Sequence, residues 1–378
     1  MLLKNALVYR NNYQSFENAD ILVQNGVITE IGNVSADGHG VIDLSFAAVV
    51  PGLIDVHSHG RAGFDFIRAD MAALSEMAKD YARHGVTTVM PTLASAPFEE
   101  MLDAVGRINS FSSQQGEADL CGVHLEGRYL NPKRRGAHAE EYLSDLDPDE
   151  LENEVFRMCK TLQISAAFEL DKDGRFAKKA KEIGATLSLG HTDATYEEAL
   201  LAEKNGVCAY THLFNAMPPM HHRSGGATCA ALMGDKFAEL ICDGIHISPE
   251  MIRFAYSLLG AHRAVLISDS MEATGCPDGE YTIAGNPATV KNGIALTPDG
   301  ALAGSTLTLD AAVNNLIDFC NIPLTDAILC ATESPARQIG VFEDRGSIDV
   351  GKRADMLILS SKDRLEIKNV IINGEFVY

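Results

Sequence analysis

A repeating pattern of hydrophobic and polar positions runs through the middle of the chain. Apolar residues from Leu74 to Tyr81 recur at helical spacing, and Gly85 ends that segment before a short apolar run. The same sequence of amphipathic helix, glycine and apolar strand recurs around Gly184 and Gly206. Strands that alternate with helices predict right-handed crossovers and a parallel sheet.

Eight such strands can be traced, and a polar residue follows each of them. They run toward His57-Ser-His59, Pro91-Thr92, His124-Leu-Glu126, Glu169, Gly190-His191, Thr211-His212, Asp243-Gly-Ile-His246 and Ser268-Asp269. A doubly wound open sheet is the alternative, but it does not usually place a polar residue after every strand. We therefore predict an α/β fold closed into a (β/α)8 TIM-like barrel, in which the carboxyl ends of the strands face one shared site.

The two ends of the chain show short alternating strands with Asn-Gly and Asp-Gly turns instead. Residues 1–50 and 346–378 are each too short for a stable sheet, so we predict that they pair into one small β-sandwich domain. Residues 51–345 then form the barrel, which takes about 250 residues in its simplest form. Part of the excess is a hairpin-like stretch near residues 279–304, read as an insertion after the eighth strand.

Composition and charge narrow the classes of function. Hydrophobic residues make up 46% and charged residues 22% of the chain, as in ordinary soluble proteins. No apolar run has the length of a signal or a membrane span, which favours a cytoplasmic location. The net charge of −21 argues against nucleic acid and acidic membranes as partners. The eight cysteines contain no CxxC pair, so we expect them reduced rather than bound to metal.

The strongest chemical signal is a set of metal-ligand residues at successive strand ends. His57 and His59 are two positions apart, so they point to the same side of an extended chain and can meet one cation. Glu126, His191 and His212 end three further strands. Each residue alone is more often a satisfied polar group, but four histidines and a carboxylate at one barrel end suit zinc or iron.

Asp269 closes this set at the eighth strand. An acid beside a metal can take a proton from water and return it to a leaving group, although a turn or N-cap role is the alternative. Two basic runs stand out in the acidic chain. The triplet ending at Arg223 could bind a phosphate through its guanidinium, or be a solvated patch. The run 133–135 reads as a loop face, with His138 just after it able to reach the site.

Nearly the whole chain, in order, resembles the N-acetylglucosamine-6-phosphate deacetylase family of the amidohydrolase superfamily. The resemblance rests on a series of motifs that are specific together and weak singly. They are PGLIDVHSHG at 51–60, HLEG at 124–127, NP at 131–132 with GAH at 136–138, GHTDA at 190–194, THLFNAM at 211–217, DGIH at 243–246, PDGEY at 277–281, LAGS at 302–305 and SPAR at 334–337.

The resemblance implies roles for individual residues. Glu126, His191 and His212 would be the principal metal ligands, and His57 and His59 place the chain with the members able to hold a second ion. Asp269 would be the catalytic acid/base, and His138 the donor that polarises the acetyl carbonyl. The family is dimeric, and phosphate-binding groups can come from the neighbouring subunit. The residues that would hold sugar and phosphate are Ala137, His138, Asn215, Ala216, Arg223, His246 and the backbone of Leu302, Ala303 and Gly304.

The chain departs from the family pattern at three places. Arg128 replaces a proline, Ser224-Gly225 replaces Glu-Pro, and the fourth strand ends Ala166-Ala-Phe-Glu-Leu170 in place of Leu-Ala-Pro-Glu. The first two are expected near the sugar-phosphate end of the pocket, and the third leaves the role of Glu169 open.

The activity implied is hydrolysis of the acetamide of N-acetylglucosamine 6-phosphate, with one or two divalent ions, zinc or iron, in a homodimer. A related amino-sugar phosphate such as N-acetylgalactosamine 6-phosphate is the alternative substrate. A hydantoinase-like or deaminase reaction is disfavoured because those relatives commonly use a carboxylated lysine where this chain has Glu126. A sugar-phosphate binder without catalysis is disfavoured because binding alone needs no proton-carrying Asp269.

Overall fold

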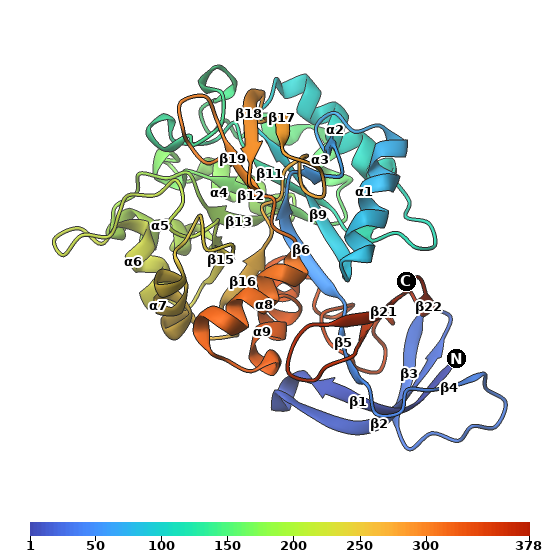
Figure 1. Cartoon of the computed structure of the whole chain (residues 1–378). Helices are drawn as coiled ribbons and strands as arrows, with labels where there is room; N and C mark the ends of the chain where they lie inside the picture. Colours follow the sequence, from blue (N-terminus) through green and yellow to red (C-terminus); the bar gives the residue numbers. More distant parts are fainter.

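The computed structural model describes residues 1–378 and is built around one parallel sheet that curves into a barrel (Figure 1). Neighbouring strands follow the order β6, β9, β11, β12, β13, β14, β15, β16. Their bounds are β6 Leu53–Ser58, β9 Val86–Ala94, β11 Val123–Glu126, β12 Leu162–Ala166, β13 Thr186–Leu189, β14 Val207–Tyr210, β15 Phe237–Ile241 and β16 Ala264–Ile267. The two-residue strand β10 (Asp119–Leu120) also pairs with β9.

The two edges of this sheet meet just beyond the last strand. The backbone N–H of Asp269, after β16, donates to the carbonyl of His57 on β6 at 2.9 Å. These are the eight strands expected from the sequence, in chain order around the barrel. The predicted fold class is therefore confirmed.

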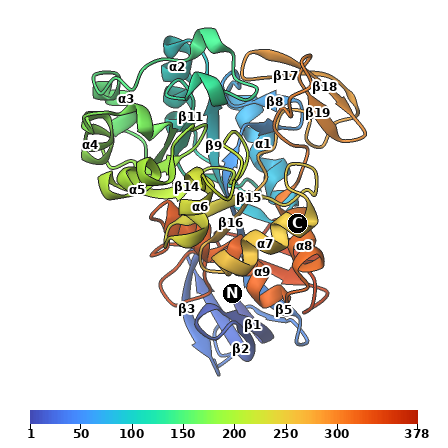
Figure 2. The same cartoon turned by 90° about the vertical axis from the view of Figure 1, so that its left-hand side faces the viewer.

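Helices cover the outside of the barrel (Figures 1 and 2). In α1, Leu74, Met77 and Tyr81 are buried, as their spacing predicts. The start of α5 is fixed by a capping box, in which the side chains of Thr195 and Glu198 each bond the other's backbone N–H. The helices are α1 Met71–Arg83, α2 Phe98–Ser110, α3 Glu154–Arg157, α4 Arg175–Glu182, α5 Tyr196–Asn205, α6 Gly226–Met233, α7 Pro249–Leu259, α8 Leu309–Cys320, α9 Leu324–Cys330 and α10 Glu333–Gln338.

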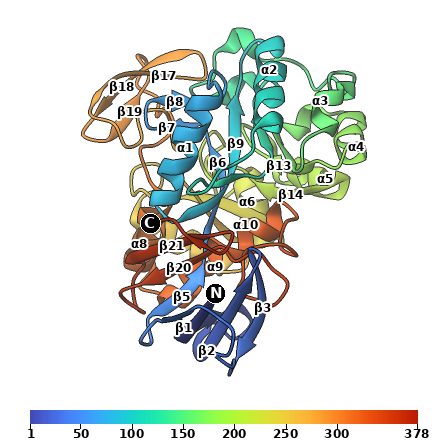
Figure 3. The same cartoon turned by 90° about the vertical axis from the view of Figure 1, so that its right-hand side faces the viewer.

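Strands from both chain ends share a second sheet, in the order β22-β21-β20-β5-β1-β2-β3, with β4 beside β1. The ends are joined where β20 runs antiparallel to β5, with Leu357 opposite Val50. The sheet lies below the barrel in Figures 1 and 3. We propose that it forms the composite domain of the two chain ends. Its strands are β1 Leu2–Arg10, β2 Ser15–Gln24, β3 Val27–Gly32, β4 Val41–Asp43, β5 Ala48–Pro51, β20 Met356–Leu359, β21 Ile367–Ile372 and β22 Glu375–Phe376.

A three-stranded antiparallel sheet lies at the end of the barrel away from strands β1–β3 of the terminal sheet (Figures 1, 2 and 3). It consists of β17 (Gly279–Ile283), β18 (Asn286–Lys291) and β19 (Ile294–Leu296), where the sequence predicts a hairpin-like insertion. A short hairpin of β7 (Gly60–Arg61) and β8 (Phe64–Asp65) follows the first barrel strand. All cysteines are free. No helix combines the length and the apolar character that a membrane crossing needs.

Candidate active site

The predicted ligand residues converge at the carboxyl end of the barrel. Glu126 ends β11, and the others lie at the end of β6 or in the loops that follow β13, β14 and β16. Three of them, His191, His212 and Asp269, have φ angles of 46°, 29° and 48°. This left-handed conformation is unfavourable for a side-chain-bearing residue, and such strain is concentrated at functional sites.

One ligand group consists of Glu126, His191 and His212, all buried. Oε1 of Glu126 lies 3.2 Å from Nε2 of His191 and 2.9 Å from Nε2 of His212. The two Nε2 atoms are themselves 3.0 Å apart. A carboxylate oxygen and two imidazole nitrogens thus converge on one point, as a cation requires.

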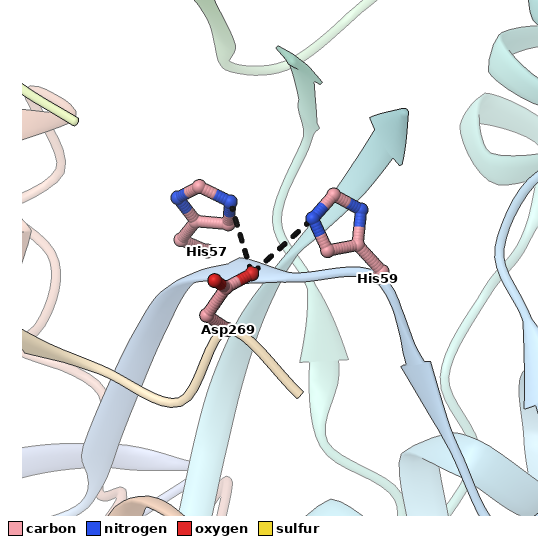
Figure 4. Close-up of side chains that lie close together, drawn as sticks. All are labelled: His57, His59 and Asp269. Atoms are coloured by element: carbon pink, nitrogen blue, oxygen red, sulfur yellow. Dashed lines mark ion pairs between the residues drawn. The ribbon is translucent and has the colours of Figure 1, made fainter. Parts of the chain in front are cut away.

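The second group consists of His57, His59 and Asp269, shown in Figure 4. Both rings turn Nε2 toward the same carboxylate oxygen, Oδ1 of Asp269, at 3.5 Å for His57 and 3.3 Å for His59. Nε2 of His57 is buried and has no hydrogen-bond partner. A buried polar atom without a partner is costly, and a cation between these three side chains would satisfy it.

Glu126 connects the two groups. Its Oε1 also lies 3.3 Å from Nε2 of His57, while its Oε2 lies 3.0 Å from Nε2 of His59. Burial alone would raise the pKa of Glu126, but His57 and three hydrogen-bonded histidines outweigh burial and hold that pKa well below its usual range. An ionised carboxylate with one oxygen toward each group can bridge two cations. The nitrogen and oxygen donors fit zinc or iron.

Asp269 and His138 are both buried on the same cavity but differ in charge. Burial favours a raised pKa for Asp269, yet the charges of His57 and His59 prevail and lower it to about 2. Burial lowers the pKa of His138 to about 4, so its ring is neutral near pH 7. The backbone N–H of Ser95 donates to Nδ1 of His138 at 3.2 Å. The single ring proton of His138 therefore sits on Nε2, the nitrogen that faces Glu126 and the cavity.

Hydrogen bonds hold the loops around the site in place. The Nδ1–H of His191 donates to the carbonyl of Arg134 at 2.8 Å, which turns Nε2 of His191 toward Glu126. Glu169 accepts from Thr192 Oγ1 at 2.6 Å and from the backbone N–H of Asp193 at 2.8 Å. The role that the sequence leaves open for Glu169 is thus to fasten the loop that carries His191.

A cavity of about 210 Å³ opens above the two ligand groups. Most of the predicted site residues line it: His59, Glu126, Ala137, His138, His191, His212, Asn215, Ala216, His246, Asp269, Leu302 and Gly304. The sequence reasoning missed five lining residues, Ala94, Gly136, Ile283, Ala284 and Ala301. Ile283 and Ala284 come from the insertion, which therefore forms one wall of the cavity. Nothing in the local sequence signals that placement.

Comparison with known proteins agrees with this geometry. The sequence pattern of the amidohydrolase family matches residues 48–377. The chain is also 34% identical to N-acetylglucosamine-6-phosphate deacetylase of Vibrio furnissii, over 94% of this chain and 89% of that protein. This chain belongs to the amidohydrolase family.

Two further similarities bear on the substrate of the amidohydrolase. The chain is 33% identical to N-acetylgalactosamine-6-phosphate deacetylase of Escherichia coli O157:H7, over 93% of each chain. The fold is also similar to the structure of a mutant N-acetyl-D-glucosamine-6-phosphate deacetylase from Mycobacterium smegmatis, in complex with N-acetyl-D-glucosamine-6-phosphate, with a TM-score of 0.89 at 28% identity. The similarity covers 100% of this chain and 99% of that one.

Three predicted residues of this amidohydrolase do not line the cavity. His57 lies beneath it, beside Glu126, and Ala303 is buried behind it with its N–H bonded to the carbonyl of Ala295. Arg223 is exposed, and its Nη1 lies 2.9 Å from Nε2 of the adjacent His222. Arg223 is thus not part of the cavity of its own chain.

Arg128, the first departure from the family pattern, also points away from the cavity. Its Nη2 donates to Glu150 at 2.8 Å, and its guanidinium lies 4.9 Å from the ring centroid of Phe98. The expectation that this departure lies at the sugar-phosphate end of the pocket is wrong for the Arg128 side chain, because an acidic partner draws it to the outside of the loop. Only its backbone N–H, bonded to Ser95 Oγ, faces inward.

Proposed function

We propose that this amidohydrolase removes the acetyl group of N-acetylglucosamine 6-phosphate and gives glucosamine 6-phosphate and acetate. The observation that carries the proposal is the meeting of two ligand groups at one cavity. Glu126, His191, His212, His59 and Asp269 line the cavity, and His57 lies just beneath it beside Glu126. The named relatives support the substrate class. We also propose that the enzyme uses one or two zinc or iron ions. One would be held by Glu126 with His191 and His212, and the other by His57 with His59 and Asp269.

Asp269 carries the proton in this scheme. A bound ion would lower the pKa of water and polarise the amide carbonyl. With its pKa lowered to about 2, Asp269 is an ionised base near neutral pH and can take a proton from the attacking water. It then returns that proton to the nitrogen as the C–N bond breaks, because an amine leaves poorly unless it is protonated.

His138 stabilises the charge that develops on the carbonyl oxygen. Its ring is neutral, and Ser95 fixes the tautomer with the proton on Nε2. An N–H donor held in place before the reaction lowers the barrier without reorganisation when charge appears. We assign His138 the role of oxyanion donor.

The sugar and its phosphate occupy the outer part of the cavity, beside Asn215, Ala216, His246 and the backbone at Leu302–Gly304. His246 is oriented there by Asp243, whose carboxylate accepts from Nδ1 of His246 at 2.6 Å. Because Arg223 lies outside its own cavity, we propose a homodimer in which Arg223 of one subunit meets the phosphate bound by the other. The cytoplasmic location stays a prediction of the sequence.

N-acetylgalactosamine 6-phosphate is the second candidate substrate. A deacetylase named for this sugar is 33% identical to the chain, against 34% for the N-acetylglucosamine-6-phosphate deacetylase of Vibrio furnissii. The two sugars differ only in the configuration of one hydroxyl, which the acetamide chemistry at Asp269 does not sense.

Acetate release decides the proposal. Purified, metal-analysed protein is incubated with N-acetylglucosamine 6-phosphate, N-acetylgalactosamine 6-phosphate and unphosphorylated N-acetylglucosamine. Release from a phosphorylated sugar at a kcat/KM far above that for the unphosphorylated one is the expected result. A metal-loaded protein that releases acetate from none of them would refute the proposal, and hydrolysis of a cyclic amide instead would favour the alternative reaction.

A further inference from the structure

The interior of the barrel contains a carboxylate, Glu239, whose side chain is fully buried. Glu239 lies in the middle of β15, below the cavity, and does not line it. The barrel of this fold is usually filled by layers of branched apolar side chains. A buried acid in that position therefore calls for a specific explanation.

Both oxygens of Glu239 are fully engaged by N–H donors. Oε2 accepts from Nδ1 of His57 at 3.0 Å and from the backbone N–H of His212 at 3.3 Å. Oε1 accepts from the side-chain amides of Gln163 at 3.2 Å and Gln338 at 2.6 Å. Glu239 thus connects a residue of each ligand group to two amides at the base of the barrel.

The bond to His57 determines how that ring is presented. Because a carboxylate accepts and the imidazole must donate, Nδ1 of His57 carries a proton. The neutral form of the ring, which is the form that binds a cation, then has its lone pair on Nε2, the nitrogen that faces Asp269 and Glu126. The bond also fixes the orientation of the ring. By contrast, Nδ1 of His59, the other histidine of that group, is buried without a partner.

We propose that Glu239 is a positioning residue that makes His57, His59 and Asp269 a cation site, by holding the His57 ring and its tautomer. The proposal deepens the proposed function and rests on it for the presence of metal. Carboxylate–histidine–metal arrangements of this kind typically change metal affinity by about ten- to a hundredfold when the carboxylate is lost. Glu239 would act in this way only on the second ligand group. Its bond to His212 is to the backbone N–H and not to the ring, and the ring of His191 is held by a different acceptor, the carbonyl of Arg134.

The competing explanation is that Glu239 only stabilises the barrel interior. Gln338 offers a matched control, because it donates to Glu239 and to Gln163 but has no hydrogen bond to His57. Glu239→Gln keeps the size of the side chain but offers Nδ1 of His57 only a neutral amide oxygen, which holds the ring and its Nδ1 proton less strongly than a carboxylate does. The amides of Gln338 and Gln163 can both turn over, since Oε1 of Gln338 has no partner to lose. Each oxygen then accepts from the new amide group, and Nε2 of Gln163 donates to Oε1 of Gln338 in place of the present bond between them. The substituted barrel is therefore expected to fold.

The test is a titration of metal-free protein with Zn²⁺ against a competing chelator, which needs no substrate. A His59→Ala variant first identifies the equivalent that belongs to the second group. In Glu239→Gln, this equivalent should bind about ten- to a hundredfold more weakly, while the other equivalent stays unchanged. Gln338→Met should bind both equivalents as the wild type does, whatever its stability.

A second variant separates charge from position. Glu239→Gln combined with Gln338→Glu keeps a buried carboxylate in the network but removes it from His57. The second Zn²⁺ equivalent should remain weak in this double variant. Recovery of wild-type affinity there would overturn the proposal. The proposal would also be overturned if Glu239→Gln left the second equivalent unchanged or weakened both equivalents equally. A wild type that binds only one Zn²⁺, or failure of both variants to fold, would overturn it as well. A lack of acetate release would refute the proposed function and leave this result standing.

Discussion

Nε2 of His191 and Nε2 of His212 lie 3.0 Å apart and face the same oxygen of Glu126. Two imidazole nitrogens so close have little reason to be there unless they share a proton or both direct lone pairs at one cation. The Nδ1–H of His191 is already donated to the carbonyl of Arg134, so a neutral His191 has its lone pair on Nε2. The geometry therefore favours the cation.

Removing one of these rings should remove metal. His191→Ala is expected to lower the bound metal of the purified protein and to abolish turnover, because the site loses a nitrogen ligand. Elemental analysis is the measurement, with Cys276→Ser as a control in a half-buried thiol outside both ligand groups. Unchanged metal content and activity would exclude His191 from the site.

The proton carrier should be Asp269. Asp269→Asn keeps the size of the side chain but cannot transfer a proton, so kcat should fall at least about a hundredfold while substrate still binds. Because the pKa of Asp269 is lowered to about 2, the wild-type carboxylate is ionised throughout the neutral range, and the defect should be similar at every pH tested there. Near-normal kcat in a metal-loaded variant would contradict the mechanism.

Arg223→Met should raise KM for the phosphorylated sugar and leave the unphosphorylated analogue nearly unaffected. The substitution keeps much of the apolar stem and removes the donors that a phosphate needs. Comparison of KM for the two substrates is the measurement. Equal effects on both substrates, or no effect on either, would show that Arg223 does not bind phosphate.

The proposed exchange of Arg223 between subunits has its own signature. A hybrid dimer of an Arg223→Met subunit and an Asp269→Asn subunit contains one complete site, because the second subunit still supplies Arg223 to the first. Mixing the two weak variants should therefore restore up to half of the wild-type activity per hybrid dimer. Mixtures that show only the sum of the separate activities would place Arg223 and Asp269 in the same subunit's site, or Arg223 in none.

A buried ion pair outside the site should matter for stability. Oδ2 of Asp119 on β10 lies 2.7 Å from Nη1 of Arg345, and the two side chains are 16% and 10% exposed. Asp119→Asn removes the more buried of the two carboxylates around the guanidinium of Arg345 and leaves only Asp344, 2.7 Å from Nη2. The loss of a charge-assisted hydrogen bond of this kind typically costs about 1.5–3 kcal/mol. Denaturant unfolding of the variant and the wild type measures the loss.

The same pair predicts a dependence on pH. Burial alone would raise the pKa of Asp119, but Arg345 and Arg353 outweigh burial and lower it below its ordinary value of 3.8. Because the pKa of Asp119 is lower in the folded than in the unfolded chain, the stabilisation by its carboxylate is complete above the unfolded-state pKa. That stabilisation is lost as the pH falls below this pKa. The difference in unfolding free energy between wild type and Asp119→Asn should therefore shrink only below about pH 4. A difference that already disappears near neutral pH would refute the assignment.

The sequence predicts the barrel well because its signals are local. Each apolar strand is followed by a polar residue, and closure of the barrel brings His57, Glu126 and His191 together without further information. Contacts that depend on how the barrel closes are invisible in the sequence. Glu239 lies 182 residues from His57, and Ser95 lies 43 residues from His138. In the sequence alone, neither Glu239 nor Ser95 differs from an ordinary strand or loop residue. The direction of the Arg128 side chain cannot be predicted either, because its bond to Glu150 depends on the fold of the intervening loop.

The left-handed backbone at His191, His212 and Asp269 has a consequence for how long the protein survives in a cell. Each such residue costs about 1–3 kcal/mol of folding free energy. A cation that binds only the folded chain returns about 4 kcal/mol at a thousand times its dissociation constant. When the ion is scarce, more chains are unfolded and open to proteases. Shortage of the ion should then lower the amount of this protein as well as the fraction that is active.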